Sequence, residues 1–243
     1  MKNKIKKIII FITPPFFLYF YGKLKKIFFP QKKSEIFYEK NFYNRRAFIF
    51  KAIKKYDNCK YLEIGVNTCE TFNSIPLKIE DKFGVDPIAG NYQMTSDEFF
   101  KKNPNLKFDV IFIDGLHHYE QCQRDCINSI KQLNKDGIIL MHDLLPLHEK
   151  SQQIPQNYSP WNGDVWKVAV ELFRSKNSDF KIINIDTGIG ILKHSDKFEY
   201  KKMPELEKCG FDDYLKYYRE FNIISSEEAL NFIQEAWLFK SII

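Results

Sequence analysis

Glycine and proline are few in this 243-residue sequence, which has ten of each, and no two cysteines stand in a Cys-x-x-Cys spacing. The low glycine and proline content excludes collagen-like and low-complexity chains, and the 44% of hydrophobic residues excludes a wholly disordered one. Five cysteines without the paired spacing predict neither a disulfide framework nor a structural zinc site, and they favour a reducing compartment. The sequence therefore describes a globular chain that can bury a sizeable core.

Acidic residues and arginine are missing from residues 1–34, although this segment contains nine lysines. The whole chain carries a formal net charge of +6, so removing the +9 of this segment leaves −3 for residues 35–243. The basic character thus belongs to the N-terminal segment, and we expect no nucleic-acid partner for the mildly acidic remainder.

Residues 1–40 are predicted to be an appendage of a domain formed by residues 41–243. The apolar run at 8–21 is shorter than the ~17–25 residues that span a bilayer as a helix, and two adjacent prolines interrupt it. We expect residues 1–30 to lie in a membrane interface, with aromatic side chains among the headgroups and lysines on anionic lipid. This predicts a cytoplasmic protein at the inner face of the membrane. Packing of the segment on the domain or on a partner chain, and a true span, are the alternatives.

Strand-like and helix-like segments alternate along the chain from residue 59. Apolar segments that we expect to be strands lie at 61–64, 82–85, 108–113, 137–141, 181–185 and 189–193, with helices near 70–79, 119–133 and 165–174. The alternation predicts a doubly wound α/β fold with a mostly parallel sheet. Asp186-Thr-Gly188 joins the last two strands as a hairpin, which requires one antiparallel strand. Ser225-Ser-Glu-Glu228 has the pattern of a capping box and predicts a final helix.

Polar residues follow the predicted strands, where open α/β sheets bind their ligands. Gly65 after the first strand permits a tight turn, and Glu63 before it suits a cationic ligand better than a pyrophosphate. Asp86 ends the second strand and suits ribose hydroxyls. The alternative is that Asp86 only starts a turn before Pro87.

Four segments together carry a resemblance to a known family. They are Tyr61-Leu-Glu-Ile-Gly65, Gly84-Val-Asp-Pro87, Asp109-Val-Ile-Phe-Ile-Asp114-Gly and Gly137-Ile-Ile-Leu-Met-His-Asp143. Over roughly residues 55–195 the chain resembles class I S-adenosylmethionine-dependent methyltransferases, above all bacterial sugar O-methyltransferases of the macrocin and mycinamicin type. The resemblance implies a Rossmann-like sheet of seven strands with the last one antiparallel. The glycine that is usual at the position of Cys69 is missing.

The resemblance also implies S-adenosylmethionine as the cofactor and a set of residues that hold it. Glu63 and Gly65 would lie near its methionine part, Asp86 on the ribose, and Ser96 and Asp97 near the adenine, with Asn67 and Asp114 completing the site.

Candidate residues for the chemistry cluster in Asp114-Gly-Leu-His117-His118 and in His142-Asp143. The resemblance places His117 at the position of the catalytic base, and Asp114 and His118 are further catalytic candidates. Asp114 and Asp143 end neighbouring strands, so they could converge with His142 on a divalent cation such as Mg²⁺. Relatives have an acidic residue at the position of His142, which puts the metal in question or favours a softer ion such as Mn²⁺ or Fe²⁺. Each histidine could instead be a structural hydrogen-bonding group.

The segment after the fourth strand end offers candidates for acceptor binding. Trp161, Trp166 and Lys167 could line an acceptor pocket, whereas Asp164 could cap the helix that follows. The loop 144–162 has the length of a lid.

We therefore predict an S-adenosylmethionine-dependent O-methyltransferase that acts on a hydroxyl of a sugar, nucleotide-sugar or glycan precursor, in surface polysaccharide biosynthesis. An iron-dependent hydroxylase of the cephalosporin type and a non-catalytic cofactor-binding module are the alternatives. A homo-oligomer is compatible with the sequence.

Overall fold

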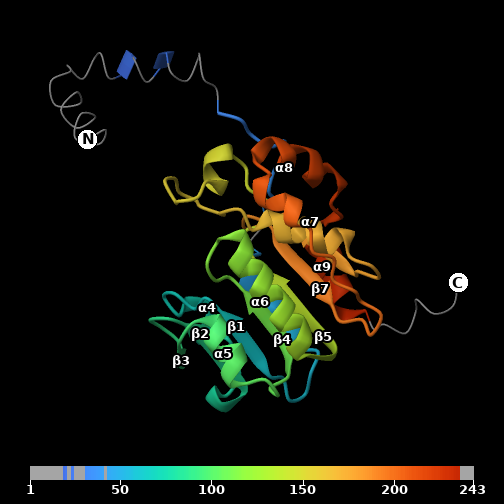
Figure 1. Cartoon of the computed structure of the whole chain (residues 1–243). Helices are drawn as coiled ribbons and strands as arrows, with labels where there is room; N and C mark the ends of the chain where they lie inside the picture. The colour runs from blue at the N-terminus through green and yellow to red at the C-terminus, as the bar shows by residue number, and fades with distance from the viewer. Residues whose placement is uncertain (1–18, 21–22, 25–30, 41–42, 236–243) are drawn as a thin grey trace, which may run out of the picture. The chain divides into compact units, whose positions relative to one another are not determined.

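The computed structural model describes residues 19–20, 23–24, 31–40 and 43–235 (Figure 1). The chain divides into two compact units, residues 1–33 and 34–243. Most of the predicted membrane-interface segment lies outside the described residues, and no helix among those that are described is long and apolar enough to cross a membrane. The second unit begins earlier than the expected residue 41 because Ser34 N donates to Leu147 O at 3.0 Å and Tyr38 Oη donates to Leu145 O at 2.5 Å.

A single sheet forms the centre of the second unit, in the strand order β3-β2-β1-β4-β5-β7-β6-β8. Its strands are β1 (Tyr61–Ile64), β2 (Lys82–Asp86), β3 (Tyr92–Gln93), β4 (Phe108–Ile113), β5 (Leu133–Met141), β6 (Phe180–Ile183), β7 (Ile189–Lys193) and β8 (Ile223–Ile224). The Rossmann-like α/β fold is as predicted, but the described residues form a sheet of eight strands where the resemblance implied seven. The additional strand is β8, whose two residues pair in parallel with the edge of β6.

The antiparallel strand predicted from the hairpin is β7, which runs antiparallel to both β5 and β6. Its turn has φ values of 44° at Asp186, 63° at Thr187 and 91° at Gly188. Three successive residues with positive φ reverse the chain within a short distance. The turn therefore carries Asp186 and Thr187 back to the carboxyl end of β5.

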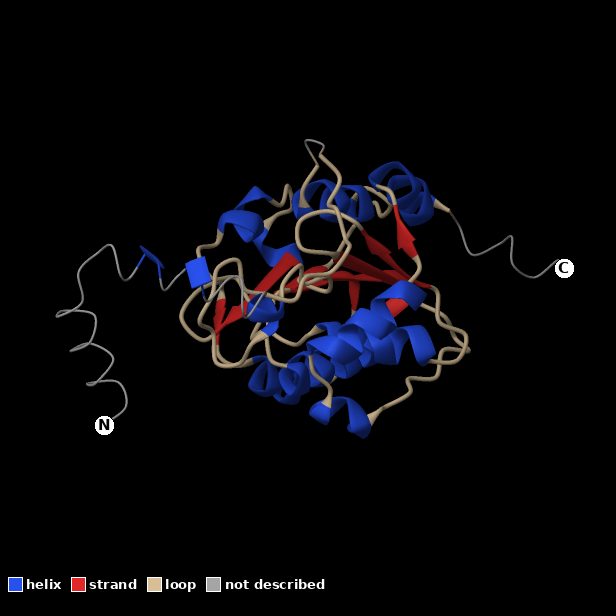
Figure 2. Cartoon of the chain, turned by 90° about the horizontal axis from the view of Figure 1, so that it is seen from above, coloured by secondary structure: helices blue, strands red, loops and turns tan. Residues whose placement is uncertain are grey.

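Helices cover both faces of the sheet (Figure 2). The α-helices are α3 (Arg45–Ile53), α4 (Glu70–Ser74), α5 (Ser96–Lys102), α6 (Tyr119–Gln132), α7 (Trp166–Arg174), α8 (Phe211–Tyr217) and α9 (Ser226–Gln234), and the 3₁₀ helices are η1 (Ile79–Asp81), η2 (Glu149–Gln152), η3 (Pro204–Lys208) and η4 (Tyr218–Glu220). One apolar cluster includes residues of α5, α6, α7 and α8, and a second includes residues of α3, α4 and α9. Helix α4 ends before the predicted residue 79 because Ile75, which precedes a proline, is extended with ψ 120°.

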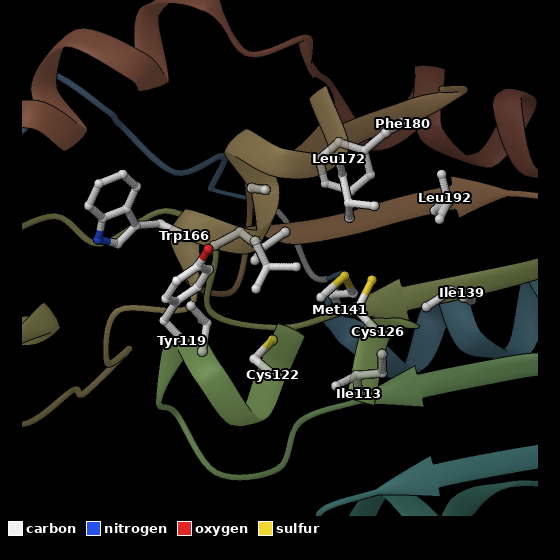
Figure 3. Packing of buried hydrophobic residues seen from close by; sticks show 14 of the residues in the cluster. Ile113, Tyr119, Cys122, Cys126, Ile139, Met141, Trp166, Leu172, Phe180 and Leu192 are labelled. Carbon is white, nitrogen blue, oxygen red and sulfur yellow. The ribbon is translucent and has the colours of Figure 1, made fainter. Parts of the chain in front are cut away.

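The inner face of α6 packs against β4, β5 and α7, as Figure 3 shows. Cys122 and Cys126 lie in this cluster and are buried. Trp166 is fully buried beside Tyr214, with ring centroids 5.3 Å apart. These contacts fix the start of α6, which directly follows the predicted catalytic residues.

Candidate active site

A cavity of about 950 Å³ opens at the carboxyl ends of β1, β2, β4 and β5. The predicted site residues that line it are Glu63, Gly65, Asn67, Asp86, Ser96, Asp114, His117, His142 and Asp143. Asp97 and His118 are not among the described residues that line this cavity. The topology of the sheet thus brings together side chains that are up to 80 positions apart in the sequence.

The turn after β1 approaches the end of β4 very closely. Gly65 has φ +84°, and a Cβ atom there would lie 2.1 Å from the Asp114 carbonyl oxygen. The backbone also connects the two segments, since Asp114 N donates to Ile64 O at 2.8 Å. Only glycine satisfies both the backbone conformation and the space.

Glu63 lies beneath this turn as a carboxylate with 1% exposure. Tyr61 Oη donates to Glu63 Oε2 at 2.6 Å. Burial raises the pKa of Glu63 to about 7, because the hydrogen bond from Tyr61 only partly offsets the loss of hydration. A buried carboxylate that accepts from Tyr61 suits a ligand that brings its own positive charge.

Asp86 both holds a turn and faces the cavity. Its Oδ1 accepts from the backbone amides of Ile88 at 2.9 Å and Ala89 at 3.2 Å. Its Oδ2 accepts from Asn67 N at 3.1 Å. The turn-forming role, given above as the alternative, is therefore present together with the position at the cavity.

At the α5 side of the cavity the wall is formed by Ser96, Gln121 and Asp125. Gln121 Nε2 donates to Ser96 Oγ at 3.1 Å and to Asp125 Oδ1 at 3.0 Å. Burial raises the pKa of Asp125 to about 6. Asp97 instead pairs with Arg124 at 3.3 Å, half exposed. Asp125 was not predicted as a site residue, because nothing in its helical spacing distinguishes it from an ordinary α6 residue.

His117 is held in a defined orientation above the end of β4. Its Nδ1 lies 3.0 Å from Trp161 O, its ring stacks on the Trp161 indole with centroids 5.0 Å apart, and its Nε2 lies 3.5 Å from Asp114 Oδ1. Burial alone would lower the pKa of His117, but the hydrogen bond to Asp114 and the charge of Asp143 outweigh it and raise that pKa above 6.5.

The segment 161–164 presses against the backbone of His117. Gly163 has φ +63°, and a Cβ atom there would lie 1.7 Å from the His117 carbonyl oxygen. Asp164 does not cap the helix that follows it: its Oδ1 accepts from Tyr119 N at 2.6 Å, at the start of α6. Its Oδ2 pairs with Lys167 Nζ at 2.8 Å, so this lysine is buried and used structurally.

Of the three predicted acceptor-binding side chains, only Trp161 lines the cavity. Trp166 lies in the core, and Lys167 is 4% exposed with its ammonium on Asp164 and on Glu207 O. His118 packs edge to face on Trp161, with centroids 6.2 Å apart.

Three carboxylates surround the imidazole of His142 and the guanidinium of Arg45 at the centre of the site. His142 Nδ1 lies 3.2 Å from Asp114 Oδ1 and 3.0 Å from Asp143 Oδ2, and His142 Nε2 lies 3.4 Å from Asp186 Oδ1. Arg45 bridges Asp186, at 2.9 Å from Nε, and Asp114, at 2.6 Å from Nη1. Burial alone would lower the pKa of His142, but the charges of Asp114 and Asp143 outweigh it and hold that pKa well above 6.5.

Arg45, Asp186 and Asn162 are functional candidates that the sequence did not reveal. Asn162 Nδ2 donates to Asp143 Oδ1 at 3.1 Å. Asp186 was interpreted only as part of a hairpin turn, and its positive φ was not foreseen. Arg45 precedes the first strand, in a region without any motif, and its position depends on how α3 packs.

The cavity suits S-adenosylmethionine in size and in the chemistry of its donors. It offers a buried carboxylate at Glu63 and a backbone-held carboxylate at Asp86, which match an ammonium group and ribose hydroxyls.

The same cavity fits a divalent cation less well. Asp114, His117 and Asp143 each offer one ligand atom within 4.8 Å of the others, whereas His142 is not part of this group. The oxygens of Asp114 and Asp143 already contact Arg45, His142, His117 or Asn162.

Comparison with known proteins gives one family match. Residues 47–144 match a family model described as a methyltransferase domain. No curated protein matches the chain.

Solved structures give distant likenesses. The MycE methyltransferase from the mycinamycin biosynthetic pathway, in complex with Mg and SAH, is 12% identical with a TM-score of 0.40, over 65% of this chain and 50% of its own. An O-methyltransferase from Bacillus cereus in complex with SAH is 11% identical with a TM-score of 0.40, over 64% and 84%. A putative caffeoyl-CoA O-methyltransferase from Staphylococcus aureus is 15% identical with a TM-score of 0.44, over 80% and 99%.

The chain thus spans half the length of MycE, and at these TM-scores the likenesses are too distant to bear on activity or substrate. The family match does not depend on these structures. It covers residues 47–144, from within α3 to just after β5. Residues 47–144 of this chain are therefore similar to a methyltransferase domain, in agreement with the enzyme class predicted from the sequence.

Proposed function

We propose that the chain is an S-adenosylmethionine-dependent O-methyltransferase that uses His117 as the general base on a sugar or glycan hydroxyl. The observation that carries the proposal is the orientation of the His117 ring between Trp161 O and Asp114 Oδ1. S-adenosylmethionine, when bound, supplies a methyl group on a positively charged sulfur.

The contact with Trp161 determines which nitrogen of His117 can act. A carbonyl oxygen only accepts hydrogen bonds, so Nδ1 carries the proton in the contact of 3.0 Å. In the neutral ring Nε2 then carries the lone pair and faces Asp114 Oδ1. Asp114, 3.5 Å away, stabilises the imidazolium that forms when Nε2 accepts a proton.

The proton balance follows from this arrangement. The acceptor hydroxyl oxygen forms the bond to the methyl carbon while the carbon–sulfur bond breaks, and the hydroxyl proton moves to His117 Nε2. The sulfur keeps the electron pair and becomes a neutral thioether. Orientation by the cavity walls and an imidazole base whose pKa is raised by the neighbouring carboxylates are the two contributions that this chain supplies.

The cavity walls support a polyhydroxylated acceptor. Trp161 presents an indole ring, which suits the apolar face of a sugar, beside carboxylates that accept from hydroxyl groups. The lysine-rich segment 1–30 supports an acceptor that is assembled at a membrane surface. We include this membrane contact, and with it the inner face of the membrane as the location, in the proposal.

The test is transfer of a labelled methyl group to a panel of nucleotide-sugars and lipid-linked glycans. We expect His117→Asn to abolish transfer while S-adenosylhomocysteine binding in calorimetry is retained. His118→Asn is the matched variant, and loss of transfer in it alone would move the base to His118. Binding without transfer to any hydroxyl acceptor would instead support the non-catalytic module.

The membrane part of the proposal has its own test. Deletion of residues 1–30 is expected to leave cofactor binding unchanged and to remove co-sedimentation with vesicles that contain anionic lipid. Retained sedimentation of the truncated chain would contradict the anchor.

The described residues do not favour an iron-dependent hydroxylase. Two neutral imidazoles and a carboxylate are the usual donors for such an iron. The described residues whose ligand atoms lie within 4.8 Å of one another, Asp114, His117 and Asp143, include one imidazole, and the family match is to a methyltransferase domain.

A further inference from the structure

The carboxylate of Asp114 already has a permanent counter-cation. Arg45 Nη1 contacts Asp114 Oδ2 at 2.6 Å, a short charge-assisted distance. The other oxygen, Oδ1, faces His142 Nδ1 at 3.2 Å and His117 Nε2 at 3.5 Å. Both oxygens of the residue best placed to bind a divalent cation are therefore engaged by the protein.

The guanidinium of Arg45 is fixed by more than this one contact. Its Nε and Nη2 donate to the two oxygens of Asp186, at 2.9 Å and 3.2 Å, and its backbone N donates to Asp186 Oδ2 at 3.1 Å. A planar guanidinium held on one side by two bonds cannot rotate away without breaking both. Arg45 therefore stays beside Asp114, with 28% of its side chain exposed.

A divalent ion on Asp114 would meet this fixed charge. To reach Oδ2 it must displace Nη1, and to reach Oδ1 it must approach within a few ångströms of a guanidinium that has no neutral form at physiological pH. Asp143 offers no easier route, since its Oδ1 accepts from Asn162 at 3.1 Å. The carboxylates that could bind a cation are present, but Arg45 already compensates the charge of Asp114.

We propose that Arg45 takes the place of a divalent cation at Asp114, so that the site binds such cations weakly and binds its cofactor without them. This inference concerns the site of the proposed function, yet it rests on the ion pairs and not on the acceptor. Arg45 is a positioning residue in this proposal, because it orients and neutralises Asp114.

The proposal predicts a gain of metal binding when Arg45 is neutralised. We would titrate the full chain with Mn²⁺ and follow the free ion by electron paramagnetic resonance. Arg45→Met is expected to bind Mn²⁺ at least about tenfold more tightly than the unchanged protein, which corresponds to about 1.4 kcal/mol. Arg46→Met removes the same charge from the next residue, whose guanidinium pairs with Glu70 at 3.1 Å, and is expected to leave the affinity unchanged.

Two results would overturn the proposal. One is tight, saturable Mn²⁺ binding by the unchanged protein, which Mg²⁺ competes for. The other is a folded Arg45→Met protein without increased affinity. If that variant does not fold, Arg45→Gln is the replacement, and the measurement on the unchanged protein remains decisive by itself.

The Arg45 proposal and the proposed function can be refuted independently of each other. Failure of methyl transfer with Mn²⁺ affinities as expected would refute the acceptor proposal alone. Transfer that stops on addition of EDTA and returns with Mg²⁺ would refute the Arg45 proposal alone.

Discussion

Replacement of Glu63 by glutamine should make the protein more stable at neutral pH and weaken its cofactor binding. Glu63 is 1% exposed, and its carboxyl has a pKa of about 7 instead of 4.5, chiefly because of burial. A neutral amide of the same shape removes the cost of burying a charge and can still accept from Tyr61 Oη.

The sign and size of the effect follow from the two pKa values. Because the pKa of Glu63 is higher in the folded state, the folded protein binds the proton more tightly between pH 4.5 and 7, and this contribution to stability is lost as pH rises. The full difference corresponds to about 3.4 kcal/mol, of which about 2.5 kcal/mol falls between pH 5 and 8.

The assay is urea unfolding of both proteins at pH 5 and pH 8. The free energy of unfolding of Glu63→Gln, relative to the unchanged protein, should rise by about 2.5 kcal/mol between the two pH values. Contacts of the new amide are independent of pH and cancel in this comparison. Glu80→Gln, at an exposed position, is the control and should show no pH-dependent difference.

Cofactor binding completes this prediction. If Glu63 holds the ammonium group of the methionine part, Glu63→Gln should weaken S-adenosylhomocysteine binding in calorimetry by at least about tenfold. A stability difference that does not change with pH would refute the buried-charge argument. Unchanged affinity would refute the assignment of Glu63 to the cofactor.

Three further substitutions test how the site is held. Gly65→Ala should lower the free energy of unfolding by about 3 kcal/mol or more, because its Cβ would lie 2.1 Å from Asp114 O, and unchanged urea unfolding would contradict the close approach. Asp164→Ala should cost about 1–2 kcal/mol, since it leaves Tyr119 N at the start of α6 without its acceptor, and thermal unfolding measures the loss. Glu171→Gln should cost about 2–4 kcal/mol, because this fully buried carboxylate accepts from two tyrosine hydroxyls and a backbone amide, and a neutral result would show that these bonds are replaceable.

The fold was predictable where burial dominates the sequence. Strands 61–64 and 108–113 are apolar except for Glu63 and Asp109, because helices cover both faces of the sheet, and both were predicted with the observed bounds. Strands β3 and β8 have two residues each, too few for a periodic pattern, and they exist only because a neighbouring strand offers an edge. This is why the six strands predicted from apolar segments are two fewer than the eight that the described residues form.

The predicted site residues are those that follow parallel strands. Glu63, Asp86, Asp114 and Asp143 come together because the carboxyl ends of neighbouring parallel strands meet at one edge of the sheet. Their roles remain predictions, although their proximity was foreseeable from order alone. Asp125 reaches the cavity from the side of a helix, so only the packing of α6 could place it.

The missed residues Arg45 and Asp186 change how the chemistry of His117 is understood. Asp114 contacts Arg45 through one oxygen and His117 through the other, so the guanidinium and the imidazole share one negative charge. The charge of His142, more than the hydrogen bonds from His117 or the charge of Arg45, holds the pKa of Asp114 well below its usual value, against the effect of burial. The more of that charge Arg45 and His142 compensate, the less remains to stabilise an imidazolium at His117. The strength of the proposed base is therefore set partly by a helix that precedes the first strand, and motifs confined to the strand ends cannot encode it.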